Sequence, residues 1–147
     1  MKRRWLFPLC VFFSLSMAAL AADPFTGTWK TNIHKMRGRS AGDPFTPGLK
    51  IETLDKDGYL VTAEPIGTGE PMVLHFYLDG KERTERNTTR TATRVNERHF
   101  TVTSKQKGTI KTDYEVSEDG KTLTLTRKGT SLTGARPTDE VVVFDKQ

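Results

Sequence analysis

The stretch Asp-Pro-Phe-Thr-Gly-Thr-Trp-Lys at residues 23–30 carries the strongest local information about how this chain folds. It follows an apolar run and places a glycine two residues before a tryptophan, at the start of the first alternating segment. Glycine lets a chain turn closely, and an indole fills a space that smaller side chains leave open. We therefore expect Gly27 to turn the chain into a sheet and Trp29 to plug one end of a small antiparallel barrel.

The residues before this stretch have the layout of a secretory signal peptide. Residues 1–4 are basic after the first methionine, residues 5–15 are almost entirely apolar, and residues 19–21 offer the small side chains that a signal peptidase requires. A membrane-spanning helix needs about 20 consecutive apolar residues, whereas a proline and two serines interrupt this run. We expect residues 1–21 to be cleaved, which predicts a secreted or periplasmic protein without stable membrane insertion.

The remainder, residues 22–147, is expected to be a single domain held by its apolar core. Its predicted mature form has no cysteine, because Cys10 lies in the signal peptide, so neither a disulfide nor a thiolate metal site is expected. Without Lys2, Arg3 and Arg4, 20 basic residues face 18 acidic ones, and the net charge falls from +5 to +2. This small excess gives no reason to expect a nucleic-acid partner.

Short runs rich in Val, Ile, Leu, Thr, Tyr and Phe alternate with polar residues from Gly48 onward. Asp-Gly pairs at 57–58, 79–80 and 119–120 favour tight hairpins, because glycine tolerates a positive φ angle. The glycine- and proline-rich segment 37–48 is expected to be a loop and not a helical lid. We expect strands near residues 27–35, 49–54, 59–65, 71–78, 89–95, 99–106, 109–117, 121–128 and 138–146.

Successive hairpins predict an all-β fold, an antiparallel up-and-down barrel of about 8–10 strands, because an open meander would leave two sheet edges exposed. A two-sheet sandwich is the alternative. It needs crossing connections, whereas every link after Gly48 is hairpin-sized except residues 129–138.

Alternation within the runs predicts which side chains face the interior. The expected inward set is Leu49, Ile51, Phe100, Val102, Ile110, Tyr114, Val116, Leu123 and Leu125. Residues 73–78 are apolar on both faces, so Leu74, Phe76 and Leu78 or Val73, His75 and Tyr77 could point inward; we take the first set.

Four arginines recur every four residues, at Arg86, Arg90, Arg94 and Arg98. On an extended segment this spacing predicts an outward stripe, with the intervening threonines facing inward. Such a stripe could bind an anionic polymer, or it could be a solvated surface that protects the strand from edge pairing. The low net charge favours the solvated surface.

The motif Phe-Thr-Gly-Thr-Trp-Lys at residues 25–30 resembles the first-strand signature of the calycins, the group of lipocalins and fatty-acid-binding proteins. Residues 121–126 and 140–146 look like the last two strands of that group, and the overall pattern is most similar to small exported bacterial lipocalin-like proteins of unassigned function. The resemblance implies a barrel around a ligand and an arginine stacked over Trp29. Arg127 is the candidate, because it continues the inward face of Leu123 and Leu125.

Two features depart from the fatty-acid-binding proteins. The loop at residues 37–48 cannot supply their helix-turn-helix portal. Val142 and Phe144 stand where the last strand of those proteins carries an Arg-x-Tyr pair that holds a carboxylate.

Catalytic and metal-binding patterns are missing from the sequence. His34, His75 and His99 fall on different predicted strands without a nearby carboxylate at ligand spacing. There is no nucleophile elbow and no glycine-rich phosphate loop. We expect no metal, no cofactor and no catalytic residue, although a barrel enzyme stays open as a third reading.

The leading hypothesis is an exported lipocalin-like protein that binds a small hydrophobic molecule in an apolar lumen. The predicted lining is Phe76, Phe100, Val102, Tyr114 and Leu125, with Tyr114 and Arg127 as polar contacts. The rival hypothesis is a barrel packed solid, whose outer surface engages a protein, a glycan or another anionic polymer.

Overall fold

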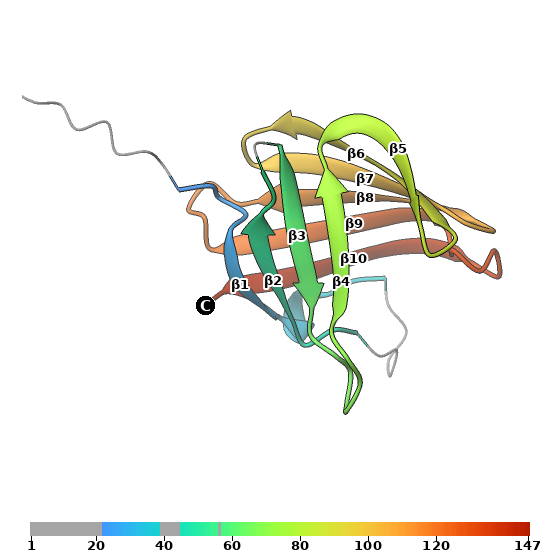
Figure 1. Ribbon diagram of the computed structural model, residues 1–147. Coiled ribbons are helices and arrows are strands. Elements are labelled where there is room, and N and C mark those ends of the chain that lie inside the picture. The colour runs from blue at the N-terminus through green and yellow to red at the C-terminus, as the bar shows by residue number, and fades with distance from the viewer. Residues whose placement is uncertain (1–21, 39–44, 56) are drawn as a thin grey trace, which may run out of the picture.

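The computed structural model describes residues 22–38, 45–55 and 57–147, so the predicted signal peptide lies outside the described residues. In this part of the chain the strands form one ten-stranded antiparallel sheet (Figure 1). The elements are β1 (Gly27–Thr31), η1 (Ile33–Lys35), β2 (Gly48–Thr53), β3 (Gly58–Ala63), β4 (Met72–Tyr77), β5 (Asp79–Glu85), β6 (Thr88–Asn96), β7 (His99–Lys105), β8 (Thr109–Val116), β9 (Thr122–Thr130) and β10 (Pro137–Lys146).

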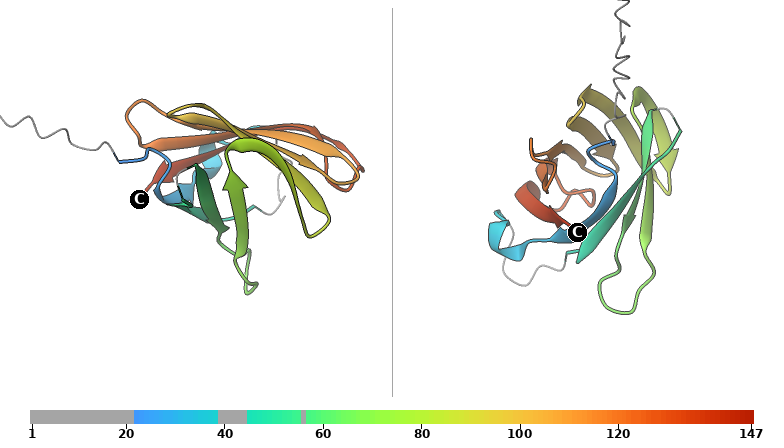
Figure 2. Two further views of the ribbon diagram at one scale, coloured as in Figure 1. Left: turned by 45° about the horizontal axis from the view of Figure 1, so that its top comes forward. Right: turned by 90° about the vertical axis from the view of Figure 1, so that its left-hand side faces the viewer.

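The strand order shows how the sheet curls on itself. It runs β4-β3-β2-β1-β10-β9-β8-β7-β6-β5, so β1 joins the two ends of the chain by pairing with both β2 and β10. The two edge strands, β4 and β5, follow each other directly in the sequence, and β4 also contacts β6. Two facing walls, β2–β4 and β5–β10, are visible in Figure 2. The predicted up-and-down barrel is confirmed, and it is nearly closed, with its gap between β4 and β5.

Trp29, the predicted plug, is fully buried in the core. Its indole Nε1 donates a hydrogen bond of 2.8 Å to the carbonyl oxygen of Phe25. Gly27 begins the strand with φ at 141°, where side-chain-bearing residues are strained. The cation over the indole is Lys146, whose ammonium lies 5.0 Å from the ring centroid, so the structure does not place Arg127 there.

An aromatic cluster fills the barrel beside the plug. Phe25 lies 5.2 Å from Tyr59 and 4.8 Å from Phe100, measured between ring centroids. Phe100 stacks on Tyr114 at 4.5 Å with an interplanar angle of 8°. Aromatic pairs of this kind add about 0.5–1.5 kcal/mol each beyond the burial of their surface. Residues from the N-terminal segment, β3, β7 and β8 are thereby locked into one core.

The inward face of β4 is the predicted one, formed by Leu74, Phe76 and Leu78. Phe76 and Leu78 are buried, and Leu74 packs against the core, whereas Val73 and Tyr77 on the other face are exposed.

The predicted arginine stripe is wrong. Ala92 is buried in the core, and Arg94 donates a hydrogen bond to the hydroxyl of the buried Tyr59, so the even-numbered residues of β6, including Arg90, face inward. Arg86 instead lies in the β5–β6 turn with a positive φ, and Arg98 follows β6 in the next turn. Ala92 and Thr88 are buried on the inner face of this strand, whereas Thr89, Thr91 and Thr93 belong to its outer face.

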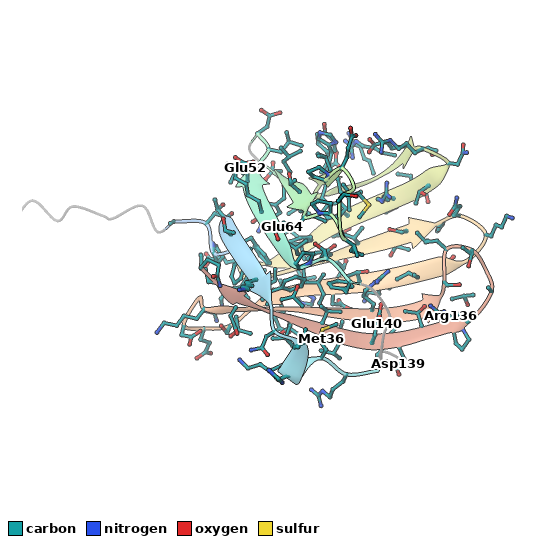
Figure 3. All side chains as sticks on the ribbon, turned by 90° about the horizontal axis from the view of Figure 1, so that it is seen from below. Met36, Glu52, Glu64, Arg136, Asp139 and Glu140 are labelled. Carbon is teal, nitrogen blue, oxygen red and sulfur yellow. The ribbon has the colours of Figure 1, made fainter. Side chains whose placement is uncertain are left out.

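The connection between β1 and β2 contains one short 3₁₀ turn among its described residues. The strand expected at 27–35 ends at Thr31, because the Asn32 side chain accepts a hydrogen bond from the backbone of His34 and starts η1. Beyond η1, Arg37 forms a bridge with Val141 of β10. In Figure 3 Met36 accordingly lies next to β10. No helix among the described residues is long and apolar enough to span a bilayer.

Candidate ligand-binding site

The inner face of β6–β10 is ordered into successive rows of side chains, because residues paired across a sheet share a face. The strand register gives a first row of Arg94, Phe100, Tyr114, Leu125 and Val142; a second row of Ala92, Val102, Thr112, Arg127 and Glu140; and a third row of Arg90, Ser104, Ile110, Gly129 and Thr138. A further row, formed by Val116, Leu123 and Phe144, lies one step closer to the tryptophan plug and is entirely apolar. The inner face of β6–β10 is therefore apolar next to the plug and carries its charged residues, Arg94, Arg127, Glu140 and Arg90, farther from it.

The lumen residues expected from the sequence do come together. Phe100, Val102, Tyr114 and Leu125 occupy the first two rows and are buried. Phe76 reaches them from the opposite wall, with its ring 6.2 Å from Phe100 and 5.7 Å from Tyr114. Their rings pack on one another and form an apolar floor beneath the polar rows. Whether this floor contacts a ligand stays a prediction.

Arg127 lies in the second row and is held by Glu140. Its guanidinium donates to the Glu140 carboxylate at 2.6 Å, and the two side chains are 28% and 11% exposed. Breaking so enclosed a pair would leave a charge with little water around it. Glu140 was not among the predicted site residues, although it alternates with the inward Val142 and Phe144 and could have been found by that spacing.

Tyr114 and Arg90 offer polar groups that the protein itself does not use. Burial raises the pKa of Tyr114 to about 12, while the positive charges of Arg127 and Arg90 act in the opposite direction. Within the described residues, neither the Tyr114 hydroxyl nor the Arg90 guanidinium has a hydrogen-bond or ion-pair partner. Arg90 was not predicted as a site residue, because the arginine spacing assigned it to the outer face.

β4 and β5 are the two edge strands of the sheet and do not pair with each other. All seven residues of β5 are exposed, and Met72, on the inward face of β4, is 53% exposed. At the corner between these strands, Arg83 makes two hydrogen bonds of 2.8 Å with the carboxylate of Asp79 and lies 4.3 Å from the centroid of the Tyr77 ring. The Arg83 hydrogen bonds hold the pKa of Asp79 well below its usual range. This corner fixes where the gap begins.

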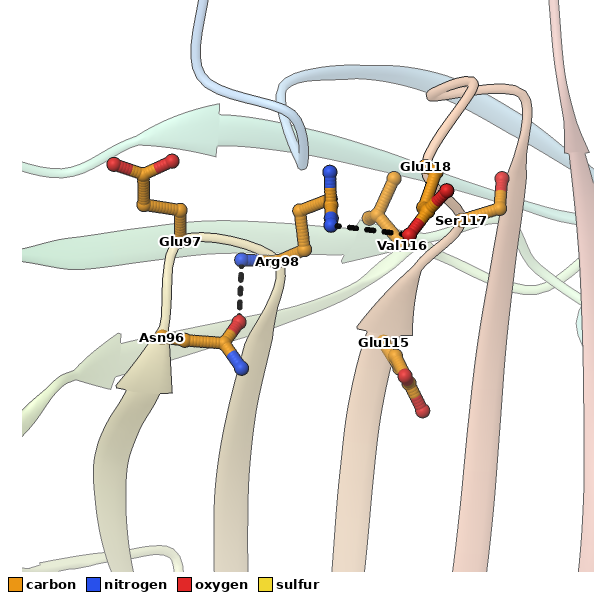
Figure 4. Close-up of a pocket in the computed structure, with 7 residues that line it drawn as sticks. All are labelled: Asn96, Glu97, Arg98, Glu115, Val116, Ser117 and Glu118. Atoms are coloured by element: carbon orange, nitrogen blue, oxygen red, sulfur yellow. Dashed lines mark hydrogen bonds and ion pairs between the residues drawn. The ribbon is translucent and has the colours of Figure 1, made fainter.

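Two hollows also lie on the described surface, and neither is lined by a residue of the three rows. One, of about 480 Å³, lies between the β6–β7 and β8–β9 turns, where Arg98 points toward Glu118 at 3.9 Å and Glu115 points away (Figure 4). The other, of about 270 Å³, lies beside Gly48, Glu64 and the C-terminal Gln147. The first is charged and open, and its carboxylates do not converge on one point.

The histidines occupy separate surfaces. His34 belongs to η1, His75 is exposed on β4, and His99 lies on the outer face of β7, where its Nε2 is 3.0 Å from Asp113. Among the described residues no group of three or more His, Cys, Asp or Glu side chains could hold a metal ion.

Comparison with known proteins identifies a solved structure with a similar fold. No protein-family model matches the sequence, and no curated protein matches it either. Among solved structures, the chain is similar to a fatty acid binding protein of Schistosoma mansoni in complex with arachidonic acid, with a TM-score of 0.63, 21% sequence identity, and 84% of this chain and 96% of that chain covered. The likeness confirms the predicted calycin-like architecture: the chain has the nearly closed antiparallel barrel fold of a fatty-acid-binding protein.

Proposed function

We propose that this protein binds a small amphipathic molecule in the half of its barrel that lies farther from the plug. The apolar part of the ligand rests on the floor formed by the first row, and its anionic end is held by Arg90 and the Tyr114 hydroxyl. One observation carries the proposal: both groups face the lumen beside an apolar floor, and neither has a partner among the described residues.

Two interactions favour the binding of such a ligand. A half-buried guanidinium without a partner has lost water, and an anion restores that loss through a charge-assisted hydrogen bond worth about 1.5–3 kcal/mol. An alkyl chain adds about 25 cal/mol for each Å² of apolar surface removed from water. The gap between β4 and β5 supplies the entrance.

The structural neighbour supports the ligand class. That protein is described as a complex with arachidonic acid, which combines an apolar chain with a carboxylate. In this chain Val142 and Phe144 are apolar and buried in the core, so they cannot hold a carboxylate. The head group therefore needs a cation elsewhere on the inner face. Arg90 is that cation.

We also propose that the protein is exported to the periplasm or out of the cell. The support is the sequence of residues 1–21, with its basic start, apolar run and small residues before the expected cleavage site.

Titration calorimetry with dodecanoate, below its micelle concentration, tests the binding function. We expect saturable binding of one molecule per chain. Arg90→Gln should weaken this binding about tenfold, because it removes one charge-assisted hydrogen bond. Arg86→Gln, the same change in the exposed β5–β6 turn, is the matched control and should leave the affinity unchanged. Equal affinities for the wild type and a folded Arg90→Gln variant would refute the assigned head-group position.

A second candidate function is an interaction protein with a filled barrel, which the close packing of Phe25, Phe76, Phe100 and Tyr114 favours. The same titration separates the two. Absence of saturable binding for dodecanoate and for its uncharged analogue dodecanol would support the filled barrel.

A further inference from the structure

We infer that the head group of the ligand is a tetrahedral oxyanion, as in an alkyl sulfonate, because Ser104 and Thr112 add two hydroxyl donors to the site of Arg90 and Tyr114. The inference rests on the proposed function and assigns ligand contacts to two further residues of the inner face. Ser104 belongs to β7 and Thr112 to β8, so the four side chains come from three neighbouring strands.

The strand register brings the two hydroxyls beside the groups already assigned to the ligand. Ser104 is the direct cross-strand partner of Arg90. Thr112 precedes Tyr114 by two residues on β8, so both point to the same face, and the β7–β8 register places Ser104 diagonally from Thr112. Burial has the largest effect on the pKa of Tyr114 and raises it, while the charge of Arg90 acts in the opposite direction. The Arg90 guanidinium therefore lies close enough to affect this phenol, although one strand separates them.

The hydroxyls of Ser104 and Thr112 are unused within the described part of the protein. Thr112 is 9% exposed, and its oxygen makes no hydrogen bond with any described residue. The same holds for the oxygen of the half-buried Ser104. A buried hydroxyl without a partner has lost hydrogen bonds to water, and a ligand oxygen restores them. Among the described side chains, Thr26 carries the completely enclosed polar atom without a partner, so the Thr112 oxygen keeps an open side on the inner face.

The number and direction of these donors match a tetrahedral head group better than a planar one. A carboxylate has two oxygens, and hydrogens prefer to approach them near the plane of the group. Donors from three strands of a curved sheet approach from different sides and do not share one plane. A sulfonate directs three oxygens outward, so Arg90 and Tyr114 hold two of them while the hydroxyls of Ser104 and Thr112 donate to the third.

Two ligands with the same alkyl chain and the same charge test this inference. Dodecanoate and undecane-1-sulfonate each carry one negative charge at pH 8, and they differ only in the head group. In calorimetric titrations below the micelle concentrations, we expect the wild type to bind undecane-1-sulfonate about tenfold more tightly than dodecanoate. Each of the two hydrogen bonds to the third oxygen contributes about a factor of three.

Substitutions of the two hydroxyl residues test the assigned contacts. Ser104→Ala and Thr112→Val each remove one hydroxyl and nearly preserve the shape of the side chain, so each should weaken sulfonate binding about threefold and leave dodecanoate binding unchanged. The double variant Ser104→Ala/Thr112→Val should lose the preference for the sulfonate. Thr112→Ser, which keeps the hydroxyl and removes the methyl group, should retain it. Thr103→Val, the same change as Thr112→Val on the outer face of β7, is the matched control and should keep both affinities.

The outcomes separate failure of this inference from failure of the proposed function. If the wild type binds dodecanoate at least as tightly as undecane-1-sulfonate, or if the folded double variant keeps the wild-type ratio of affinities, the tetrahedral head group is overturned while amphiphile binding stands. A loss of the same factor for both ligands in the variants would overturn the assigned contacts, because the hydroxyls would then act on the shape of the barrel and not on a third oxygen. If neither ligand binds, the proposed function itself is wrong.

Discussion

Tyr59 is the residue at which the N-terminal segment, β3 and β6 meet. Its ring packs 5.2 Å from both Phe25 and Phe100, and its hydroxyl donates to Asp23 while it accepts from Arg94. Burial first, and the Asp23 hydrogen bond second, raise the pKa of this phenol far above its ordinary value. The Tyr59 side chain thus packs in the core and also hydrogen-bonds to Arg94 of the opposite wall of the barrel.

Tyr59→Phe keeps the ring and removes the hydroxyl, so it measures the contribution of the hydrogen bonds with Asp23 and Arg94 alone. We expect a loss of about 1–3 kcal/mol in the free energy of unfolding, because Asp23 and Arg94 lose the oxygen that they share. Urea unfolding followed by circular dichroism gives the value. Tyr77→Phe, on the exposed face of β4, is the control and should change the stability by less than about 0.5 kcal/mol. A loss no larger than that of the control would show that the network contributes nothing.

The burial of Trp29 could be predicted from the sequence, but the cation that contacts its ring could not. A glycine and an indole at the start of the first strand predict a buried plug, because those side chains have a strong local reason to lie there. The cation above the indole was predicted to be Arg127 and is Lys146. Lys146 reaches the ring because it pairs with Trp29 in the β1–β10 register, a long-range pairing that no local pattern encodes.

At the scale of elements, the clearest strands in the sequence are those with one apolar face. Alternation in β7, β8 and β9 predicts their inward residues, and the structure buries Phe100, Tyr114 and Leu125 as expected. The strand β5 went unpredicted, because its charged, fully exposed residues show no alternation. In β6 the arginines and threonines give no apolar signal, so the wrong face was chosen and Arg90 was lost from the candidate site.

The pairing of β8 with β9 depends on a close approach at Gly129. Its φ is 132°, and an added Cβ atom would lie 2.1 Å from the carbonyl oxygen of Thr109, a backbone atom that cannot move aside without disturbing the pairing. Gly120 also has a positive φ, at 70°, but no neighbour within 4 Å of the added atom. Substitution of Gly120 by alanine therefore measures the destabilisation caused by the positive φ alone, whereas substitution of Gly129 adds the steric clash with Thr109.

We expect Gly120→Ala to cost about 0.5–1 kcal/mol of stability, and Gly129→Ala to cost more by at least about 1 kcal/mol. Thermal or urea unfolding gives the two values. Amide exchange in β8 and β9 should rise in the Gly129 variant alone, because the clash lies in that pair of strands. Equal costs for the two variants would mean that β9 shifts freely and that the contact with Thr109 does not constrain it.

At the scale of the whole molecule, the barrel is asymmetric along its axis. The plug, the aromatic cluster and the strand pairs that join β1 to β2 and β10 close one half. Farther from the plug, the inner face of β6–β10 carries Arg127 and Arg90, and the sheet ends in the two unpaired strands β4 and β5. The asymmetry arises because β4 and β5 are both edge strands, and the charges of β5 keep its free edge from pairing with another chain.

This arrangement predicts how the stability of the whole fold depends on alkaline pH. The folded state raises the pKa of Tyr114 from 10.0 to about 12, mainly because burial disfavours the phenolate. Since the folded-state pKa is the higher one, the contribution of the neutral phenol is complete below pH 10 and is lost as the pH rises from 10 to 12. The free energy of unfolding should therefore fall by up to about 1.4 kcal/mol per pH unit in that window through this residue. Urea unfolding at pH 9 and pH 11 measures the fall, and Tyr114→Phe should reduce it, whereas Tyr77→Phe should not. An equally steep fall in Tyr114→Phe would mean that this phenol ionises as easily in the folded barrel as in the unfolded chain, and that the floor of the lumen is open to water.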